Sequence, residues 1–170
     1  MKTFITTLLL LLCLNSMAQN QLPDFSFEQI KMSNITMPYR KATIAPVQGE
    51  KPAVVIYLHG GSSKGSDNTT QMKEPGIELI ANYLQSSHIN ALFLVPQCPK
   101  DKSWMGPMYP VLKSMIERYT TDNGAQPATA DINKVYIFGG SMGGTGTWGM
   151  LSMYPDMFAA AMPVAGNPSQ

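Results

Sequence analysis

A serine set among glycines is the first feature of this sequence whose residue types and spacing could do covalent chemistry. Ser141 lies in the pentapeptide GGSMG, residues 139–143, which matches the pattern G-x-S-x-G. A β-branched and aromatic run, Val135 to Phe138, ends directly before it, as a buried strand would. A nucleophile on a tight strand-to-helix turn needs small neighbours, because larger side chains would collide with both elements. The pattern therefore predicts that Ser141 is a nucleophile at a sheet edge, near the positive end of the following helix.

The same segment has two other interpretations. One is a Gly-Ser turn without chemistry, since such a pentapeptide also occurs by chance. The other is a dinucleotide fingerprint, because Gly144, Gly146 and Gly149 have the spacing G-x-G-x-x-G. Gly144, however, comes several residues after the strand ends, and the next strand leads into AGNPS, which lacks an acidic residue to hold a ribose. We therefore interpret these glycines as contacts for close helix–sheet packing. The interpretation of Ser141 as a nucleophile implies neither an organic cofactor nor a metal.

Acyl transfer also requires a site for the oxyanion, and two backbone N–H groups aimed at it contribute several kcal/mol. The residue after the nucleophile, Met142, is expected to supply one of them. The segment YLHGG, residues 57–61, ends an earlier apolar run, and its glycines permit the backbone that such a loop requires. Gly61 is our first choice for the second N–H and Ser62 our second. We interpret His59 as a residue that orders this loop rather than as the general base, which follows the nucleophile in this architecture.

Four apolar runs without alternation predict strands covered on both faces; they are Ala53–Leu58, Ala91–Val95, Val135–Phe138 and Ala159–Val164. Helical spacing of apolar residues separates them; it is found at Ile77, Ile80, Tyr83 and Leu84, at Val111, Leu112, Met115, Ile116 and Tyr119, and at Trp148, Leu151 and Met153. Two alternating segments within residues 25–44 suit an antiparallel pair at a sheet edge. The order predicts an α/β fold with a mostly parallel, doubly wound sheet and helices on both faces. Its loops at residues 59–71, 96–107 and 139–146 would share the carboxyl edge.

The N-terminus predicts export. Lys2, the apolar run Phe4–Leu14 and the small-x-small triplet at 16–18 match a cleaved signal peptide, residues 1–18. A lipoprotein signal around Cys13 is the weaker alternative. We therefore expect a periplasmic or secreted domain over residues 19–170, without stable membrane insertion after cleavage. Cys98 would then be a lone thiol, most simply buried. A formal net charge of +1 gives no footprint for a nucleic-acid partner.

Together these segments resemble the α/β-hydrolase superfamily and are most similar to its small esterase branch. That branch includes phospholipase/carboxylesterase-like, dienelactone hydrolase-like and feruloyl or acetylxylan esterase-like proteins, and predicted peptidases related to prolyl oligopeptidase. The resemblance rests on YLHGGSSKGSDN, VPQCPKDKSW and DINKVYIFGGSMGGTGTW. It implies Ser141 as nucleophile, with Met142 and Gly61 as oxyanion donors. It also implies that Asp67 and Asn68 tie down the oxyanion segment, and that Trp104 either lines a substrate pocket or packs in the core.

The sequence departs from this family in one large respect. The family's acid and histidine follow the strand at residues 159–164, and neither Asp131 nor Asp156 occupies the position of that acid. The chain therefore resembles the N-terminal two-thirds of an esterase. The resemblance implies a serine hydrolase that cleaves carboxylic esters, with small-molecule or carbohydrate esters such as acyl or feruloyl groups on polysaccharides as substrates. A peptidase of the prolyl oligopeptidase type is one alternative, and a catalytically incompetent 170-residue chain is the other.

Overall fold

The computed structural model describes residues 22–168. The expected signal peptide lies outside these residues, so export stays a prediction. No helix within residues 22–168 is long and apolar enough to cross a membrane. The elements in chain order are β1 (Ser26–Met32), β2 (Ile35–Ile44), β3 (Ala53–Leu58), η1 (Gly61–Ser63), η2 (Thr70–Lys73), α2 (Pro75–Ser86), β4 (Ala91–Pro96), α3 (Met108–Thr120), β5 (Val135–Gly140), α4 (Met142–Met153), η3 (Pro155–Met157) and β6 (Ala160–Val164).

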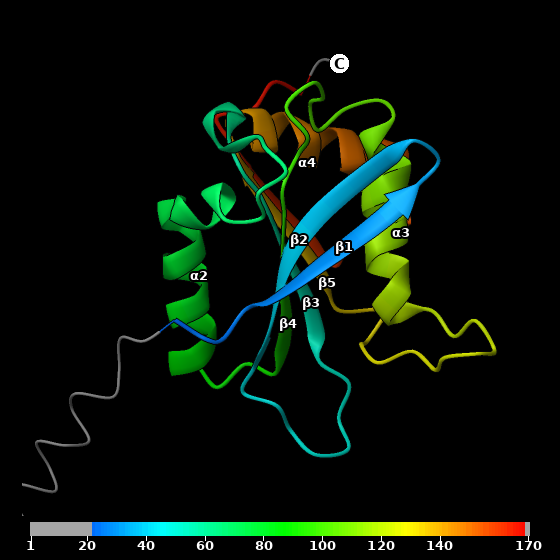
Figure 1. Cartoon of the computed structure of the whole chain (residues 1–170). Coiled ribbons are helices and arrows are strands. Elements are labelled where there is room, and N and C mark those ends of the chain that lie inside the picture. Colours follow the sequence, from blue (N-terminus) through cyan, green and yellow to red (C-terminus); the bar gives the residue numbers. More distant parts are fainter. Residues whose placement is uncertain (1–21, 169–170) are drawn as a thin grey trace, which may run out of the picture.

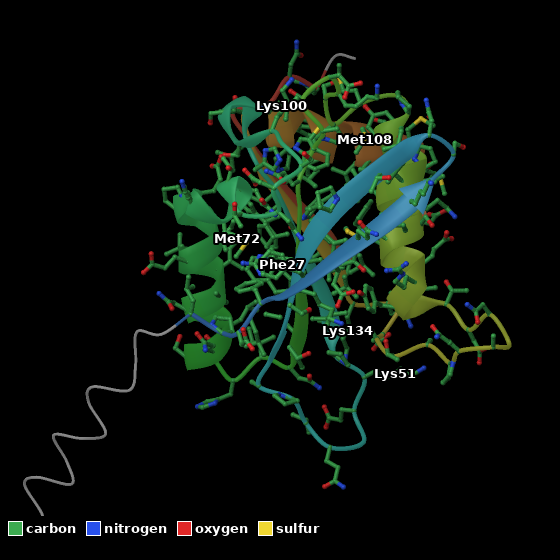
Figure 2. The ribbon with its side chains drawn as sticks, viewed as in Figure 1. Phe27, Lys51, Met72, Lys100, Met108 and Lys134 are labelled. Atoms are coloured by element: carbon green, nitrogen blue, oxygen red, sulfur yellow. The ribbon has the colours of Figure 1, made fainter. Side chains whose placement is uncertain are left out.

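The strands form one mixed sheet in the order β1-β2-β4-β3-β5-β6 (Figure 1). Strands β4, β3, β5 and β6 pair in parallel, whereas β1 and β2 join them antiparallel at one edge. Because the four parallel strands point the same way, the loops that follow them gather at one end of the sheet. Figure 2 shows Lys100, from the loop after β4, at the end opposite Lys51 and Lys134, which precede β3 and β5. The predicted α/β architecture and its edge pair are confirmed.

Helices cover both faces of the sheet. Helix α2 packs on one face, where Ile77, Ala81 and Leu84 join strand residues such as Val55 and Phe93 in one apolar cluster. Helices α3 and α4 lie on the other face (Figure 1), where the second cluster collects the opposite side of β3 together with buried side chains of α3. Successive residues of β3 therefore point into two different cores. This explains why its sequence is apolar throughout rather than alternating.

Strand β6 differs from the prediction. Its sequence predicts a strand buried on both faces, but Ala160, Met162 and Val164 are exposed. The reason is its place at the sheet edge, where β5 is its one pairing partner among the described strands. Continuous hydrophobicity alone could not show which strand lies inside the sheet and which lies at its edge.

An apolar groove of about 710 Å³ lies on the α2 face of the sheet, beside the helix, and leaves Tyr136 and Phe138 half-buried.

Helix α4 also differs in the face that it buries. The sequence points to Trp148, Leu151 and Met153 as its apolar face, yet Trp148 and Met153 are 38% and 56% exposed. The buried positions are instead mostly small, at Gly143, Gly144, Gly146, Thr147 and Gly149, with Met150. The glycine face of the helix is therefore the buried one: Gly143 and Gly144 lie against backbone atoms of β3 and β6, whereas Gly146 and Gly149 lie against Trp104 and Tyr109.

Candidate active site

Ser141 occupies a strained turn between β5 and α4. Its φ of 55° and ψ of −117° lie outside the regions that side-chain-bearing residues prefer. Two backbone bonds hold this conformation: Ser141 N–H donates to Val164 O at 2.9 Å, and Ser141 O accepts from Thr145 N–H at 3.0 Å. A conformation of this kind costs about 1–3 kcal/mol and persists where the surrounding structure enforces it. The side chain is exposed, as a nucleophile must be.

Glycines on either side of the serine are required by close backbone contacts. A Cβ built on Gly139 would lie 2.3 Å from Gly143 O, and one built on Gly143 would lie 1.9 Å from Leu58 O. Both distances are far below any real contact, and the atoms in the way are backbone atoms that cannot turn aside. Thus Gly139 and Gly143 let α4 begin directly against β3 and β5, which gives the G-x-S-x-G spacing a steric cause.

The oxyanion loop, residues 59–71, begins beside this turn. Leu58 pairs with Gly139 in the sheet register, so β3 and β5 end side by side. A Cβ built on Gly60 would lie 3.8 Å from Gly140 O and 3.9 Å from Ser141 Cβ. The structure therefore brings together two segments that lie 80 residues apart, and this loop is adjacent to the predicted nucleophile.

The predicted oxyanion donors lie where free N–H groups are available. Met142 is the first residue of α4, where an α-helix leaves its N–H groups without partners. Gly61 opens η1 and is exposed, with nothing within 4 Å of a Cβ built on it. Within residues 22–168 the N–H groups of Met142, Gly61 and Ser62 have no acceptor. Their roles as donors to an oxyanion remain predictions that this arrangement allows.

His59 is fully buried and orders the loop, as predicted. Its Nε2 accepts a hydrogen bond from Cys98 N–H at 2.9 Å, so its Nδ1 carries the proton and donates to Gly60 O at 2.6 Å. Its backbone O accepts from the indole N–H of Trp104 at 2.9 Å, and the two rings meet edge to face. Because both ring nitrogens are engaged, His59 has none left to accept a proton from Ser141. The exposed His88 precedes β4 and so lies at the opposite end of the sheet.

Stability is expected to fall in mild acid because of His59. Burial lowers the pKa of His59 below its usual 6.5, although the bond to Gly60 opposes this. The unfolded chain therefore binds a proton as the pH drops through 6.5 while the folded chain does not. The free energy of unfolding should decrease by up to about 1.4 kcal/mol per pH unit, until the folded-state pKa is reached. Urea unfolding between about pH 7.5 and pH 5.5 measures this slope.

In His59→Gln, the free energy of unfolding should no longer show the pH dependence that His59 contributes. The control is His88→Gln, which changes the exposed histidine and should keep this pH dependence. An equal slope in wild type and His59→Gln would contradict the prediction.

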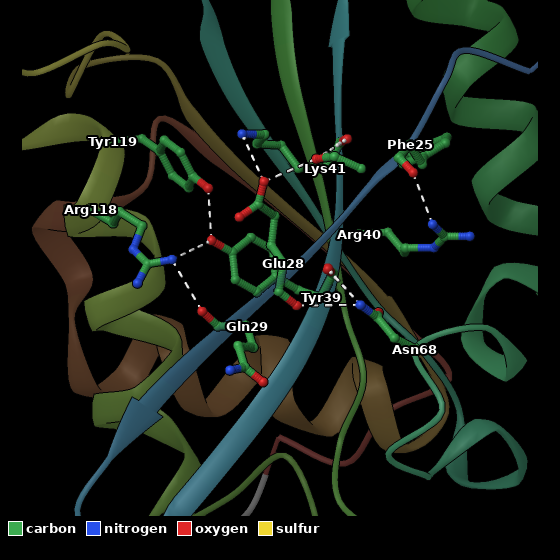
Figure 3. Close-up of polar contacts among 10 residues, drawn as sticks. Phe25, Glu28, Gln29, Tyr39, Arg40, Lys41, Asn68, Arg118 and Tyr119 are labelled. Carbon is green, nitrogen blue, oxygen red and sulfur yellow. Dashed lines mark hydrogen bonds and ion pairs between the residues drawn. The ribbon is translucent and has the colours of Figure 1, made fainter.

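Asp67 and Asn68 tie down the oxyanion loop, as the resemblance implied. The Asp67 carboxylate accepts bonds from the hydroxyl and N–H of Thr70 and from the N–H of Thr69, which hold its pKa far below the usual range. The buried Asn68 donates to Tyr39 O at 3.0 Å and to Glu28 O at 3.3 Å, so it fastens the loop to the β1–β2 hairpin (Figure 3).

The alternative that Trp104 lines a substrate pocket is wrong. Its side chain has no exposed surface and packs under the oxyanion loop against Gly146, where a Cβ would lie 2.3 Å from Trp104 Cβ. Trp104 is thus a core residue whose indole N–H supports the backbone of His59. Cys98, near the start of the same loop after β4, is a free and fully buried thiol, and burial raises its pKa to about 12. Such a thiol stays protonated and unreactive, in line with the prediction.

The spacing of Gly144, Gly146 and Gly149 is explained by packing. A Cβ on Gly144 would meet Val164 O at 2.4 Å, and one on Gly149 would meet the Tyr109 hydroxyl oxygen at 2.0 Å. Protein atoms therefore occupy the space where a dinucleotide would have to approach these glycines. No group of three or more histidine, cysteine or acidic residues in the described part of the chain could hold a metal ion.

A proton acceptor for Ser141 is not found in residues 22–168, where its hydroxyl has no hydrogen-bond partner. Asp131 accepts a hydrogen bond from Asn133 N–H and pairs with Lys134, so it is a turn residue before β5. One residue that the sequence interpretation missed is Gln97, which is fully buried at the end of β4 and bonds the oxyanion loop. Its position at the carboxyl edge was the only signal that could have indicated it.

Comparison with known proteins supports the architecture. No family model and no curated protein matches the chain. Among solved structures it is similar to a thermostable esterase, with 29% identity and a TM-score of 0.65. It is also similar to the feruloyl esterase module from Clostridium thermocellum in complex with sinapinate, with 16% identity and a TM-score of 0.66. A third similar structure is the acylaminoacyl peptidase of Pyrococcus horikoshii, with 15% identity and a TM-score of 0.59.

These similarities cover most of the chain but only part of each other protein. They cover 85%, 88% and 86% of this chain, and 41%, 56% and 24% of the esterase, the feruloyl esterase module and the peptidase. The chain therefore spans less than two-thirds of the length of the structures to which it is similar. What is shared is the fold of this part of each protein.

Proposed function

Because the chain belongs to the α/β-hydrolase superfamily and resembles its esterase branch, we propose that Ser141 is the nucleophile of a serine hydrolase acting on carboxylic esters. The observation that carries this proposal is the strained backbone of Ser141, with φ 55° and ψ −117°, directly beside the Gly60–Gly61 turn. Strain of this kind concentrates at functional sites, where it aims a side chain. A Gly-Ser turn without chemistry would not need it.

The proposed reaction follows from what surrounds the serine. Ser141 Oγ attacks the ester carbonyl and its proton passes to a general base. The developing oxyanion accepts hydrogen bonds from the N–H groups of Met142 and Gly61, which have no other acceptor in residues 22–168. The protonated base gives its proton to the alcohol as it leaves. Water, deprotonated by the same base, then attacks the acyl-serine, and the proton returns to Ser141 Oγ as the acid is released. The proposal requires a general base from outside the described residues, because His59 is buried and doubly bonded.

Esters of plant polysaccharides, such as acetyl or feruloyl groups, are the substrates that we favour, together with a periplasmic or secreted location. The feruloyl esterase module among the similar structures and the export signal predicted from residues 1–18 support this choice. A peptidase is the second candidate, since the acylaminoacyl peptidase is also among the similar structures. The ester is favoured because the 29% identity is to an esterase, whereas the peptidase shares 15%.

The decisive experiment compares ester and amide substrates on the full-length protein. We expect p-nitrophenyl acetate and methyl ferulate to be hydrolysed with a kcat/KM at least about tenfold above that for an acylaminoacyl p-nitroanilide. An active-site-directed fluorophosphonate should label wild type and leave Ser141→Ala unlabelled, which separates nucleophile identity from substrate choice. Faster amide hydrolysis would favour the peptidase, and ester hydrolysis that survives in Ser141→Ala would exclude this serine as the nucleophile.

A further inference from the structure

The oxyanion loop must be held in place by groups other than those that react. Its residues 61–68 contain one short turn, η1, and several exposed positions, and a Cβ built on Gly61 would have no atom within 4 Å. A loop of this kind gains its geometry from tethers to the sheet. One tether outside the catalytic groups is the side chain of Gln97, which lies directly after β4 and is fully buried.

The Gln97 amide is fully used by the loop. Its Oε1 accepts from Asn68 N–H at 2.7 Å, and its Nε2 donates to Asp67 Oδ1 at 2.9 Å and to Ser63 O at 3.3 Å. The loop also lies close against this side chain, since a Cβ on Gly65 would be 2.7 Å from Gln97 Nε2. One donor group and one acceptor atom thus fix three loop residues at once.

These bonds lead to both ends of the loop. Ser63 closes η1 through a bond from its N–H to Gly60 O at 3.2 Å, so a tether on Ser63 O fixes the turn that presents Gly61. At the far end, Asn68 is fastened to the β1–β2 hairpin through Tyr39 O (Figure 3). The backbone N–H of Gln97 also donates to Pro38 O in β2 at 2.8 Å. Gln97 therefore joins the hairpin, β4 and the oxyanion loop.

We infer that Gln97 is a positioning residue for catalysis: its amide sets where the Gly61 N–H lies relative to Ser141. The inference rests on the proposed function. A glutamine suits this place because the loop offers an acceptor at Asp67 and a donor at Asn68, and an amide matches both without a charge at neutral pH. A carboxylate would face Asp67 as a like charge. An apolar side chain would leave the N–H of the buried Asn68 without its acceptor.

The test compares Gln97→Glu with wild type in the full-length protein. We expect kcat for p-nitrophenyl acetate to fall about 10- to 100-fold, because a small displacement of an oxyanion donor has effects of this size. KM should stay within about twofold, since the tether does not touch the substrate. Gln85→Glu is the matched control, because Gln85 lies on α2 and makes no side-chain hydrogen bond within residues 22–168.

The pH profile separates positioning from a general loss of structure. In Gln97→Glu the new carboxyl group lies against Asp67, so the pair should hold a shared proton in mild acid. The protonated group can again donate to Asp67, as Nε2 does in wild type. The ratio of kcat in Gln97→Glu to kcat in wild type should therefore rise several-fold between about pH 8 and pH 5. In Gln97→Met, which has no proton to regain, the ratio should stay flat.

Hydrogen exchange of residues 61–70 is a readout that does not depend on turnover. Both variants should lose amide protection there while the sheet stays protected, and Gln97→Met decides the question if Gln97→Glu does not fold. An unchanged kcat, a change in KM alone, or unchanged protection of this segment would overturn the inference. If wild type hydrolyses no ester, the proposed function fails, and exchange still decides whether Gln97 orders the loop.

Discussion

Ser141→Gly should abolish hydrolysis and at the same time make the protein more stable. Removing the nucleophile is expected to lower kcat by a factor on the order of 10⁴ or more. Glycine adopts a φ of 55° without steric cost, so the substitution releases about 1–3 kcal/mol of strain. The greater freedom of glycine in the unfolded chain offsets about 0.5–1 kcal/mol of this gain. We expect a net stabilisation of about 1 kcal/mol, or a rise in Tm of about 2–4 °C.

Ser141→Ala is the matched control for this prediction. Alanine removes the hydroxyl but keeps a Cβ, so the backbone strain remains. Its activity should be as low as that of Ser141→Gly, while its free energy of unfolding should stay within about 0.5 kcal/mol of wild type. Urea unfolding monitored by tryptophan fluorescence and initial rates with p-nitrophenyl acetate measure the two quantities. Equal stability of the glycine and alanine variants would show that the turn stores no strain, and residual Ser141-independent turnover would remove the serine from the mechanism.

Gly143→Ala should be strongly destabilising, because a Cβ at Gly143 makes the shortest contact of any glycine in residues 22–168. Its Cβ would lie 1.9 Å from Leu58 O and 2.9 Å from His59 O. These are backbone atoms of β3 and of the oxyanion loop, so the clash can be relieved only by moving α4 away from the sheet. We expect a loss of about 3 kcal/mol or more in the free energy of unfolding, at or beyond the upper end of ordinary overpacking effects. Hydrolysis should fall as well, because the same movement separates the serine turn from the loop.

Gly61→Ala tests whether the damage comes from the contact rather than from the added methyl group. A Cβ on Gly61 has nothing within 4 Å, so the variant should unfold within about 0.5 kcal/mol of wild type. The midpoint of urea unfolding compares the two variants directly. Equal stability of Gly143→Ala and Gly61→Ala would contradict the close contact between α4 and β3 at Gly143.

These predictions share one physical basis. The candidate site is built by backbone proximity more than by side-chain chemistry. The ends of β3 and β5 are in register at Leu58 and Gly139, α4 starts against both, and the oxyanion loop is tied to the sheet by buried polar groups. The backbone strain is at Ser141, and the close contacts are at the glycines. The hydrogen bonds of His59 and Gln97 hold the oxyanion loop beside the Ser141 turn.

Much of this arrangement could be predicted because it depends on local sequence patterns. Apolar runs of four to six residues marked β3, β4 and β5, since strands covered by helices on both faces need no polar side. The glycines around Ser141 marked the turn, since only there does a strand lead into a helix without room for side chains. Helix α3 was also predictable, because its apolar spacing matches a single buried face.

Other features depend on what lies beside each element, and a local pattern does not contain that. Strand β6 has the sequence of a buried strand but lies exposed at the sheet edge. The apolar spacing of α4 predicted that Trp148 lies on its buried face, yet the glycines are buried and Trp148 is exposed. Trp104 could have lined a pocket or packed in the core, and only its fit beneath His59 and Gly146 decided between them.

The sequence by itself determined the class of fold, the place of the serine turn and the neighbouring loop, because strand periodicity and glycine spacing are local properties. The tertiary structure alone decided that Ser141 is strained, that His59 has both ring nitrogens engaged and that Gln97 tethers the oxyanion loop. Each of these depends on contacts between residues far apart in the chain, such as the bond between Cys98 N–H and His59 Nε2. Such contacts exist only once the sheet has brought the ends of its strands together.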